Sequence, residues 1–183
     1  MKKFFLLSSL LVFATAIQAQ KYFTRTGKVS FYASTPLENI EAVTKETTAV
    51  IDTATKELAF QVTVKSFLFE RTLMQEHFNE NYMESDKYPN STFKGKIADS
   101  SKVDFAKDGS YTVNVKGELI MHGITKNITV PGTITVKKGV IIVNSKFKIK
   151  PEDYNIKISS MVANKIAKEI EIKVNCDLQS LKK

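Results

Sequence analysis

The chain has 183 residues, with 27 lysines and arginines against 19 aspartates and glutamates, which gives a formal net charge of +8 at pH 7. Arg25 and Arg71 are the only arginines and the lysines are scattered, so we expect no nucleic-acid partner. The single cysteine, Cys176, excludes an internal disulfide, so the core and the backbone hydrogen bonds must hold the fold.

The beginning of the chain has the pattern of a secretory signal peptide. Two lysines precede a short apolar run, Phe4 to Ala16, and Ala19 is the small residue at the expected cleavage site. The apolar run is too short to span a membrane. We therefore expect removal of residues 1–19, a mature domain of residues 20–183, and a periplasmic or secreted location.

The first part of the mature chain alternates apolar and polar residues, as strands with one buried face do. Residues 22–34 are predicted to form the first strand, and residues 48–52 and 57–67 the next two, around a turn at residues 53–56. Residues 37–45 are rich in polar side chains and are predicted to form a connection, with at most a short helical turn.

Residues 67–96 are the one stretch with helical spacing. It carries two rows with a period of four, which are Met74, Phe78 and Tyr82 on an apolar side, and Glu76, Glu80 and Glu84 on a side expected to face water. The pair Tyr88-Pro89 excludes a helix beyond it, because the residue before proline avoids the α region. We expect a helical plug or lid around which a sheet closes.

Alternation then returns and continues to the end of the chain. Strands are predicted over residues 92–97, 111–121, 128–136, 141–149 and 166–178, with turns at His122-Gly123 and at residues 137–139. Pro131-Gly132 interrupts the third of these strands and indicates a bulge or an edge position. Cys176 falls on the apolar side of the last strand and is expected to be an inert buried thiol.

About eight strands, hairpin-sized connections and one helical insertion predict an all-β antiparallel domain, either a barrel or a sandwich. Long twisted strands favour closure into a barrel, because closure removes unpaired edges. An eight-stranded barrel is either filled by side chains or holds one small ligand. Four glycines counted on inward rows either leave room for a ligand or only relieve strand bending, and they are Gly95, Gly117, Gly132 and Gly139.

Two blocks of the sequence resemble the YceI-like family. The first is residues 74–79 (MQEHFN) with residues 87–89 (KYP) leading into 92–95 (TFKG), and the second is residues 117–126 (GELIMHGITK). The resemblance covers essentially the whole mature chain. It implies an eight-stranded antiparallel lipocalin-like barrel with a short helical insertion, exported from the cytoplasm, which binds a polyisoprenoid or another long amphiphilic lipid. It implies no cofactor other than a bound isoprenoid lipid or quinone.

The candidate ligand-binding residues are apolar residues of the inward rows and the helix, together with one histidine. They are Phe60, Val62, Val64, Phe67, Phe69, Met74, His77, Phe78, Phe93, Val115, Leu119 and Met121. As a set they favour an isoprenoid chain, because flexible methionines and flat phenylalanines conform to a branched hydrocarbon. For each residue alone, an ordinary packed core is the alternative.

The two histidines have alternative readings. His77 is expected either to meet a head group at the barrel mouth or to bond to the sheet, and His122 to bond to nearby backbone in a turn. Two histidines at this separation predict no metal site. An enzyme acting on a small lipophilic substrate would use His77 with Glu70 or Glu76, but no nucleophile elbow or nucleotide loop supports it.

The sequence leaves three further kinds of partner undecided, which are a protein, a membrane surface and a second copy of the chain. A filled barrel would instead bind a protein through its outer surface. The basic balance is compatible with peripheral contact with an anionic membrane surface. The sequence does not decide whether the chain forms a homodimer.

Overall fold

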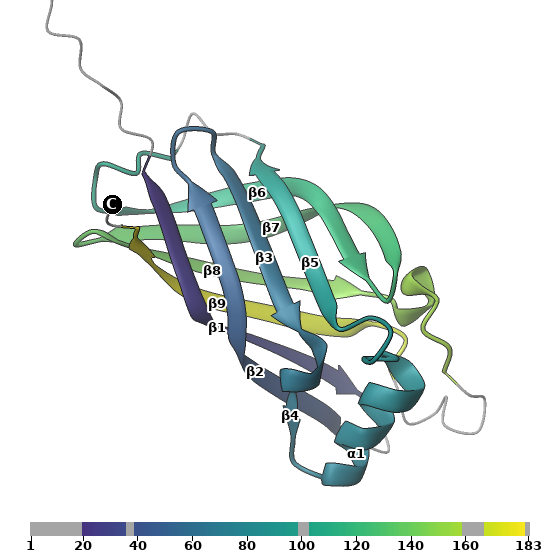
Figure 1. The fold of residues 1–183 in the computed structure, drawn as a ribbon. Helices are drawn as coiled ribbons and strands as arrows, with labels where there is room; N and C mark the ends of the chain where they lie inside the picture. The colour runs from purple at the N-terminus through teal and green to yellow at the C-terminus, as the bar shows by residue number, and fades with distance from the viewer. Residues whose placement is uncertain (1–19, 36–38, 99–102, 159–166, 182–183) are drawn as a thin grey trace, which may run out of the picture.

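The computed structural model describes residues 20–35, 39–98, 103–158 and 167–181, and these residues form a closed antiparallel β-barrel (Figure 1). The described chain holds nine strands in the order β1-β9-β8-β7-β6-β5-β3-β2-β4, and pairing of β1 with β2 closes the barrel. The strands are β1 (Lys21–Ser34), β2 (Asn39–Asp52), β3 (Glu57–Thr63), β4 (Leu68–Phe69), β5 (Asn90–Ile97), β6 (Gly109–Met121), β7 (Ile124–Lys137), β8 (Val140–Ile149) and β9 (Ile170–Ser180). Because β4 is a two-residue strand paired only with β2, eight strands form the wall, which confirms the predicted fold class.

The two ends of the barrel differ. Figure 1 shows the start of β1 and the end of β9 together at one end, and the helix α1 (Thr72–His77) at the other. A tightly packed core fills the end where β1 starts and β9 ends. Its most deeply buried side chains include Ile51, Ile134, Ile141, Cys176 and Leu178.

Cys176 lies on the inner row of β9 and is fully buried, as predicted. Burial raises the pKa of its thiol to about 12. The thiol is therefore protonated at neutral pH, and it acts as a small apolar side chain of the packed end.

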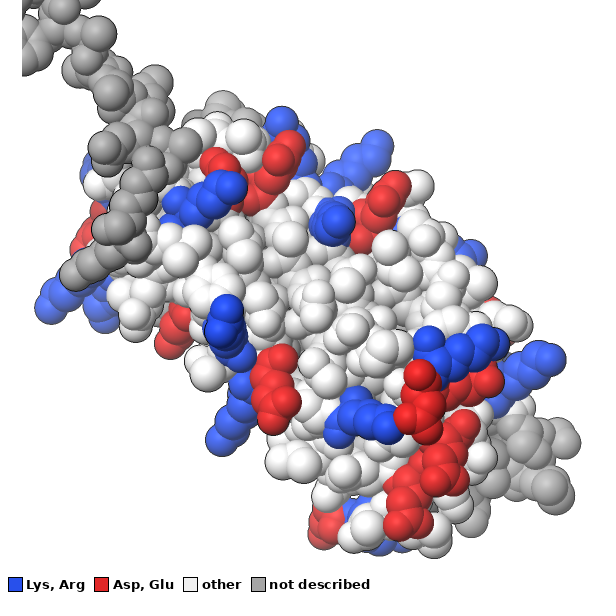
Figure 2. Space-filling view, in the orientation of Figure 1, with Lys and Arg blue, Asp and Glu red and all other residues white. Residues whose placement is uncertain are grey.

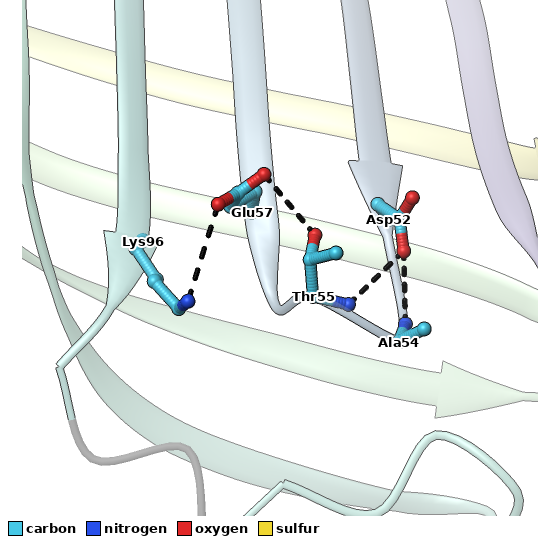
Figure 3. A network of polar contacts seen from close by, with 5 residues as sticks. All are labelled: Asp52, Ala54, Thr55, Glu57 and Lys96. Atoms are coloured by element: carbon cyan, nitrogen blue, oxygen red, sulfur yellow. Dashed lines mark hydrogen bonds and ion pairs between the residues drawn. The ribbon is translucent and has the colours of Figure 1, made fainter. Parts of the chain in front are cut away.

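The turn between β2 and β3 lies at this packed end and is held by side chains (Figure 3). The Asp52 carboxylate accepts hydrogen bonds from the backbone N–H groups of Ala54, at 3.0 Å, and Thr55, at 3.1 Å. The bond from Thr55 lowers the pKa of Asp52. Thr55 Oγ1 also donates to Glu57, whose carboxylate lies 3.9 Å from Lys96 Nζ on β5. This confirms the predicted turn at residues 53–56.

The prediction of a connection over residues 37–45 was wrong from residue 39 onward. β2 begins at Asn39, which pairs with Ser34 of β1. Its inward residues here include Ala42 and Thr44, which are too small or too polar to give a clear apolar row. Thr44 is fully buried, and its hydroxyl lies 2.7 Å from Ser66 Oγ. Long-range pairing with β1 therefore decides the structure of this segment.

The predicted strand over residues 57–67 also ends early, at Thr63. A 3-10 turn, η1 (Val64–Ser66), follows it. Ser66 Oγ donates to the Thr63 carbonyl at 2.7 Å, which favours a turn over continued pairing. The turn carries the chain across the open end of the barrel toward α1.

Strand β7 runs from Ile124 to Lys137 and pairs with β6 without a register shift, so the predicted bulge at Pro131-Gly132 is absent from this ladder. Its pairing with β8, however, begins only at Gly132. Gly139, counted on an inward row by the sequence pattern, instead occupies the β7–β8 turn with φ +77°.

The helical segment lies where the sequence predicted it, but it is shorter and changes pitch. α1 is followed directly by η2 (Phe78–Tyr82), a π-helical turn. No helix in the described ranges is long and apolar enough to cross a membrane. Figure 2 shows positive and negative side chains interspersed over the visible face, with acidic side chains gathered toward the α1 end.

Candidate functional site

The half of the barrel nearest α1 is hollow. It encloses a cavity of about 580 Å³, which is within the range of roughly 300–1,000 Å³ typical of small-molecule sites. Inward-facing apolar side chains in this half are only partly buried because they face the cavity rather than one another. They include Phe60, Val62, Phe93, Leu119, Met121, Phe147, Ile172 and Val174.

All twelve residues that the sequence named as ligand-binding candidates border this one cavity. Strands β3, β5 and β6 supply five of them, at Phe60, Val62, Phe93, Val115 and Leu119, and the end of β6 supplies Met121. The segment from η1 to η2 supplies the remainder, which are Val64, Phe67, Phe69, Met74, His77 and Phe78. Their contact with a ligand stays a prediction.

The cavity wall also includes residues that were not named as candidates. Most come from β1 and from β7 to β9, and they include Val29, Phe31, Ile134, Val143, Phe147, Ile149, Ile170, Ile172 and Val174. The same alternation of apolar and polar residues marks them. The pattern cannot say, however, which part of an inward row borders a cavity and which part is packed, because that depends on the register between strands.

Four phenylalanines form a cluster at the α1 end of the cavity. Phe78 of η2 stacks on Phe31 of β1, with ring centroids 5.4 Å apart. Phe69 lies 5.0 Å from Phe78, and Phe67 lies 5.3 Å from Phe31. Such pairs contribute about 0.5–1.5 kcal/mol each beyond simple burial. The cluster therefore anchors the helical segment over the mouth of the cavity.

The π-helical turn changes which side chains face inward. The N–H group of Met83 donates to the carbonyl of Phe78 at 2.8 Å, one residue beyond the α-helical spacing. Met83 is consequently buried, and both Tyr82 and Met83 border the cavity. A strict period of four, as read from the sequence, finds Tyr82 but misses Met83.

Polar groups are scarce in the cavity wall and include two at the mouth. Arg71 and His77 supply the only basic side chains among the described wall residues, and none of those residues is acidic. Arg71 Nη2 lies 3.3 Å from the sulfur of Met74. The acidic side chains of this end therefore lie outside the described cavity wall.

His122 is buried in the turn between β6 and β7 and joins three segments. Its Nδ1 lies 3.0 Å from the backbone oxygen of Tyr154, and its Nε2 lies 2.7 Å from a carboxylate oxygen of Glu84. The ring of Tyr88 packs against its edge. Carbonyl and carboxylate oxygens are both hydrogen-bond acceptors, so the ring of His122 links the two segments.

This network corrects two sequence interpretations. Glu84 does not continue a water-facing helical row, because the helix has ended at Tyr82 and the φ of Glu84 is +42°. His122 does bond to backbone, but the partner, Tyr154, is 32 residues away. A single sequence carries no signal for either contact.

We expect His122→Ala to lower the free energy of unfolding by about 1–3 kcal/mol, because it leaves the Tyr154 carbonyl and the Glu84 carboxylate without their shared donor. Urea denaturation followed by circular dichroism measures this. His77→Ala is the matched control, since His77 is exposed and should leave the midpoint unchanged. Equal midpoints for His122→Ala and the unmodified protein would contradict the structural role.

A metal centre is not supported within the ranges that the structure describes, because they contain no group of three or more His, Cys, Asp or Glu side chains placed to hold an ion. Cys176 is enclosed in the packed end, and His122 is engaged with Glu84 and Tyr154.

Solved structures with this architecture include three bacterial proteins. A polyisoprenoid-binding domain from Saccharophagus degradans, implicated in plant cell wall breakdown, superimposes with a TM-score of 0.76 at 14% identity, covering 89% of this chain and 99% of that one. Burkholderia cenocepacia BcnA gives 0.69 at 22% identity, with 83% and 95% coverage. The Campylobacter jejuni YCEI protein gives 0.57 at 18% identity, with 100% and 94% coverage. At these identities the likeness establishes the fold alone.

No curated protein matches the sequence. The model of the YceI-like domain, in contrast, matches residues 20–178, which is nearly the whole of the chain after the predicted signal peptide. With the barrel, its helical segment and the two sequence blocks in agreement, the chain belongs to the YceI-like family.

Proposed function

We propose that this protein binds a long-chain amphiphilic lipid, a polyisoprenoid or an isoprenoid quinone, with the hydrocarbon chain in the barrel cavity. The observation that carries the proposal is an apolar cavity of about 580 Å³ in a barrel whose other end is tightly packed. The hollow is therefore a local feature rather than a general looseness of the core. The polyisoprenoid-binding domain with the same fold supports this choice of ligand.

Apolar burial alone supplies enough free energy for such a ligand. Each CH₂ group moved from water into the cavity contributes about 0.8 kcal/mol. A few isoprene units therefore bind without a strong polar contact. The wall is mostly Phe, Met, Val, Leu and Ile, which conform to a branched chain.

A binding role is better supported than catalysis. The enzyme alternative requires His77 to act with Glu70 or Glu76. Among the described residues, none of the hydrogen bonds or ion pairs found joins His77 to either carboxylate. A mostly apolar wall is what holding a hydrocarbon chain requires, which is why we propose binding rather than catalysis.

Export to the periplasm or the medium is part of the proposal. Residues 1–19 lie outside the described residues, and β1 begins at Lys21. The lysines and the short apolar run of residues 1–19 support the predicted signal peptide, and cleavage after Ala19 would leave every described strand intact. A homodimer stays a prediction.

Peripheral membrane contact is proposed at the mouth, where Leu68 and Leu73 are 64% and 61% exposed. Leu73 also borders the cavity. Because acidic side chains gather at this end (Figure 2), we propose that apolar side chains, rather than attraction to an anionic surface, make the contact.

A fluorescence titration tests the lipid proposal. The chain has no tryptophan, so Phe93→Trp places one reporter in the cavity wall. We expect saturable quenching by an isoprenoid quinone at a one-to-one ratio. Ile120→Trp, on the exposed side of the adjacent strand β6, is the control and should not respond. A silent Phe93→Trp reporter with both quinones and prenols would refute lipid binding and favour a partner on the outer surface.

A further inference from the structure

The barrel wall has a split between β7 and β8. The β6–β7 ladder spans Ile124 to Val136 of β7, and the β8–β9 ladder spans the whole of β8. β7 and β8, however, pair only from Gly132–Ser145 to Lys137–Val140. The two strands therefore part beyond Gly132 and Ser145, within the half that holds the cavity.

The wall is thin at the apex of this split. Gly132 has no side chain, and a Cβ atom built there would find only the Asn144 carbonyl oxygen, at 3.0 Å, and Ser145 Cβ, at 3.8 Å, among its nearest atoms. Ser145 Oγ is turned to the Pro131 carbonyl, to which it donates at 2.6 Å. Proline has no N–H group, so Pro131 donates no bond across the split.

A second hollow lies on the outside of the barrel at this point. It shares six wall residues with the inner cavity, which are Pro131, Gly132, Thr133, Asn144, Ser145 and Val174. Thr133 and Asn144 are direct partners on the outward row, yet both border the inner cavity as well. The inner cavity and the outer hollow thus lie on the two sides of the same short stretch of wall, at the apex of the split.

The chemistry of the outer hollow is opposite to that of the cavity. Its described wall contains three lysines, Lys28, Lys146 and Lys173, and no acidic residue. Hydroxyl and amide groups complete it, and they come from Ser30, Thr112, Thr133, Asn144, Ser145 and Asn175. Asn175 donates to Asn144 Oδ1 at 2.6 Å, which leaves the Asn144 amide N–H groups for another acceptor.

One carboxylate outside this wall arranges two of the lysines. Glu171 accepts from Lys146 at 2.9 Å and from Lys173 at 3.3 Å. The bond from Lys146 lowers the pKa of Glu171, which keeps the carboxylate ionised. Two lysines thus share one negative charge, and Lys28 on β1 adds a third ammonium group. The hollow keeps an excess of two positive charges.

We propose that the outer hollow binds the phosphate or diphosphate head group of an amphiphile whose chain lies in the cavity, with the link passing through the β7–β8 split. This rests on the proposed lipid function and narrows it to phosphorylated isoprenoids. An uncharged quinone ring can only accept hydrogen bonds through its carbonyl oxygens, whereas a phosphate also gains the attraction between opposite charges, so three ammonium groups favour the phosphate.

The test compares a prenol with the prenyl phosphate of equal chain length, titrated into the Phe93→Trp protein. We expect the phosphate to bind about tenfold more tightly or better, with the advantage falling at high salt. In a variant carrying Lys28→Gln, Lys146→Gln and Lys173→Gln, the advantage should disappear while prenol affinity is kept. Retained prenol binding also shows that the variant is folded. The control carries Lys94→Gln, Lys96→Gln and Lys116→Gln on the β5–β6 wall, which changes the net charge equally.

The remaining outcomes decide against the proposal in distinguishable ways. If neither ligand binds, the lipid function itself fails. Equal affinities for prenol and prenyl phosphate would leave the lipid function standing and overturn the head-group site. The head-group site is also overturned if the phosphate advantage survives in the lysine variant but is lost in Arg71→Gln. The head group then lies at the mouth. If inorganic diphosphate alone binds as tightly as the prenyl phosphate, the site takes a free anion rather than a head group.

Discussion

Gly117→Val is expected to prevent the barrel from closing normally and to lower the free energy of unfolding by several kcal/mol. Gly117 of β6 lies opposite Gly95 of β5. A Cβ atom at Gly117 would overlap the Lys94 carbonyl oxygen and Gly95 Cα, which are backbone atoms and cannot swing aside. Forcing strands apart in a closed barrel also strains neighbouring ladders, so the cost exceeds the roughly 1–3 kcal/mol of ordinary overpacking.

Urea unfolding of the purified variant measures this loss, and an insoluble or unfolded product is an equally clear result. Gly139→Asn is the matched control. Gly139 has a positive φ in the β7–β8 turn, but a Cβ atom at this position would have no neighbour within 4 Å, and asparagine tolerates that backbone conformation. We expect its midpoint to stay close to that of the unmodified protein. If Gly117→Val unfolds at the same urea concentration, the close approach of β5 and β6 is wrong.

Filling the cavity is expected to weaken lipid binding by about 100-fold. Val62 of β3 and Val174 of β9 are partly buried and border the cavity. Replacing both by phenylalanine in the Phe93→Trp protein displaces on the order of four CH₂ groups of a bound chain. At about 0.8 kcal/mol per CH₂, the loss is roughly 3 kcal/mol.

The quinone titration measures this effect, and Gln61→Phe is the control. Gln61 lies beside Val62 but on the outer, exposed side of β3, so the added ring leaves the cavity unchanged. Urea denaturation should show that the filled variant is folded. Undiminished affinity in the filled variant would mean that the ligand binds somewhere other than this cavity.

Local alternation in the sequence predicted the strands and their inward rows, whereas the choice of a barrel over a sandwich also rested on the length of the strands and on the resemblance to the YceI-like family. Phe60 and Val62 of β3, or Leu119 and Met121 of β6, face inward at every register that keeps their strands half-buried. The sequence also predicted the helical segment, because its apolar residues repeat every four positions whereas those of the strands repeat every two. Here local pattern and tertiary structure agree.

Other features depend on contacts between residues far apart in the sequence. The start of β2 carries Ala42 and Thr44 inward, and only pairing with β1 makes it a strand. The contact of Glu84 with His122 depends on the end of the helix and on the β6–β7 turn together. The registers between strands decide which end of the barrel is packed and where β7 separates from β8. The alternation of apolar and polar residues within one strand does not determine these registers.

The most direct test of a lipid-holding barrel is mass spectrometry on the protein purified from its native source without detergent. Intact protein sprayed under non-denaturing conditions should carry an added mass, and an organic extract of the same sample should yield an isoprenoid lipid of that mass at about one per chain. Lipid binding would be contradicted if repeated preparations gave only the mass of the unliganded polypeptide and bound no added prenol, prenyl phosphate or quinone.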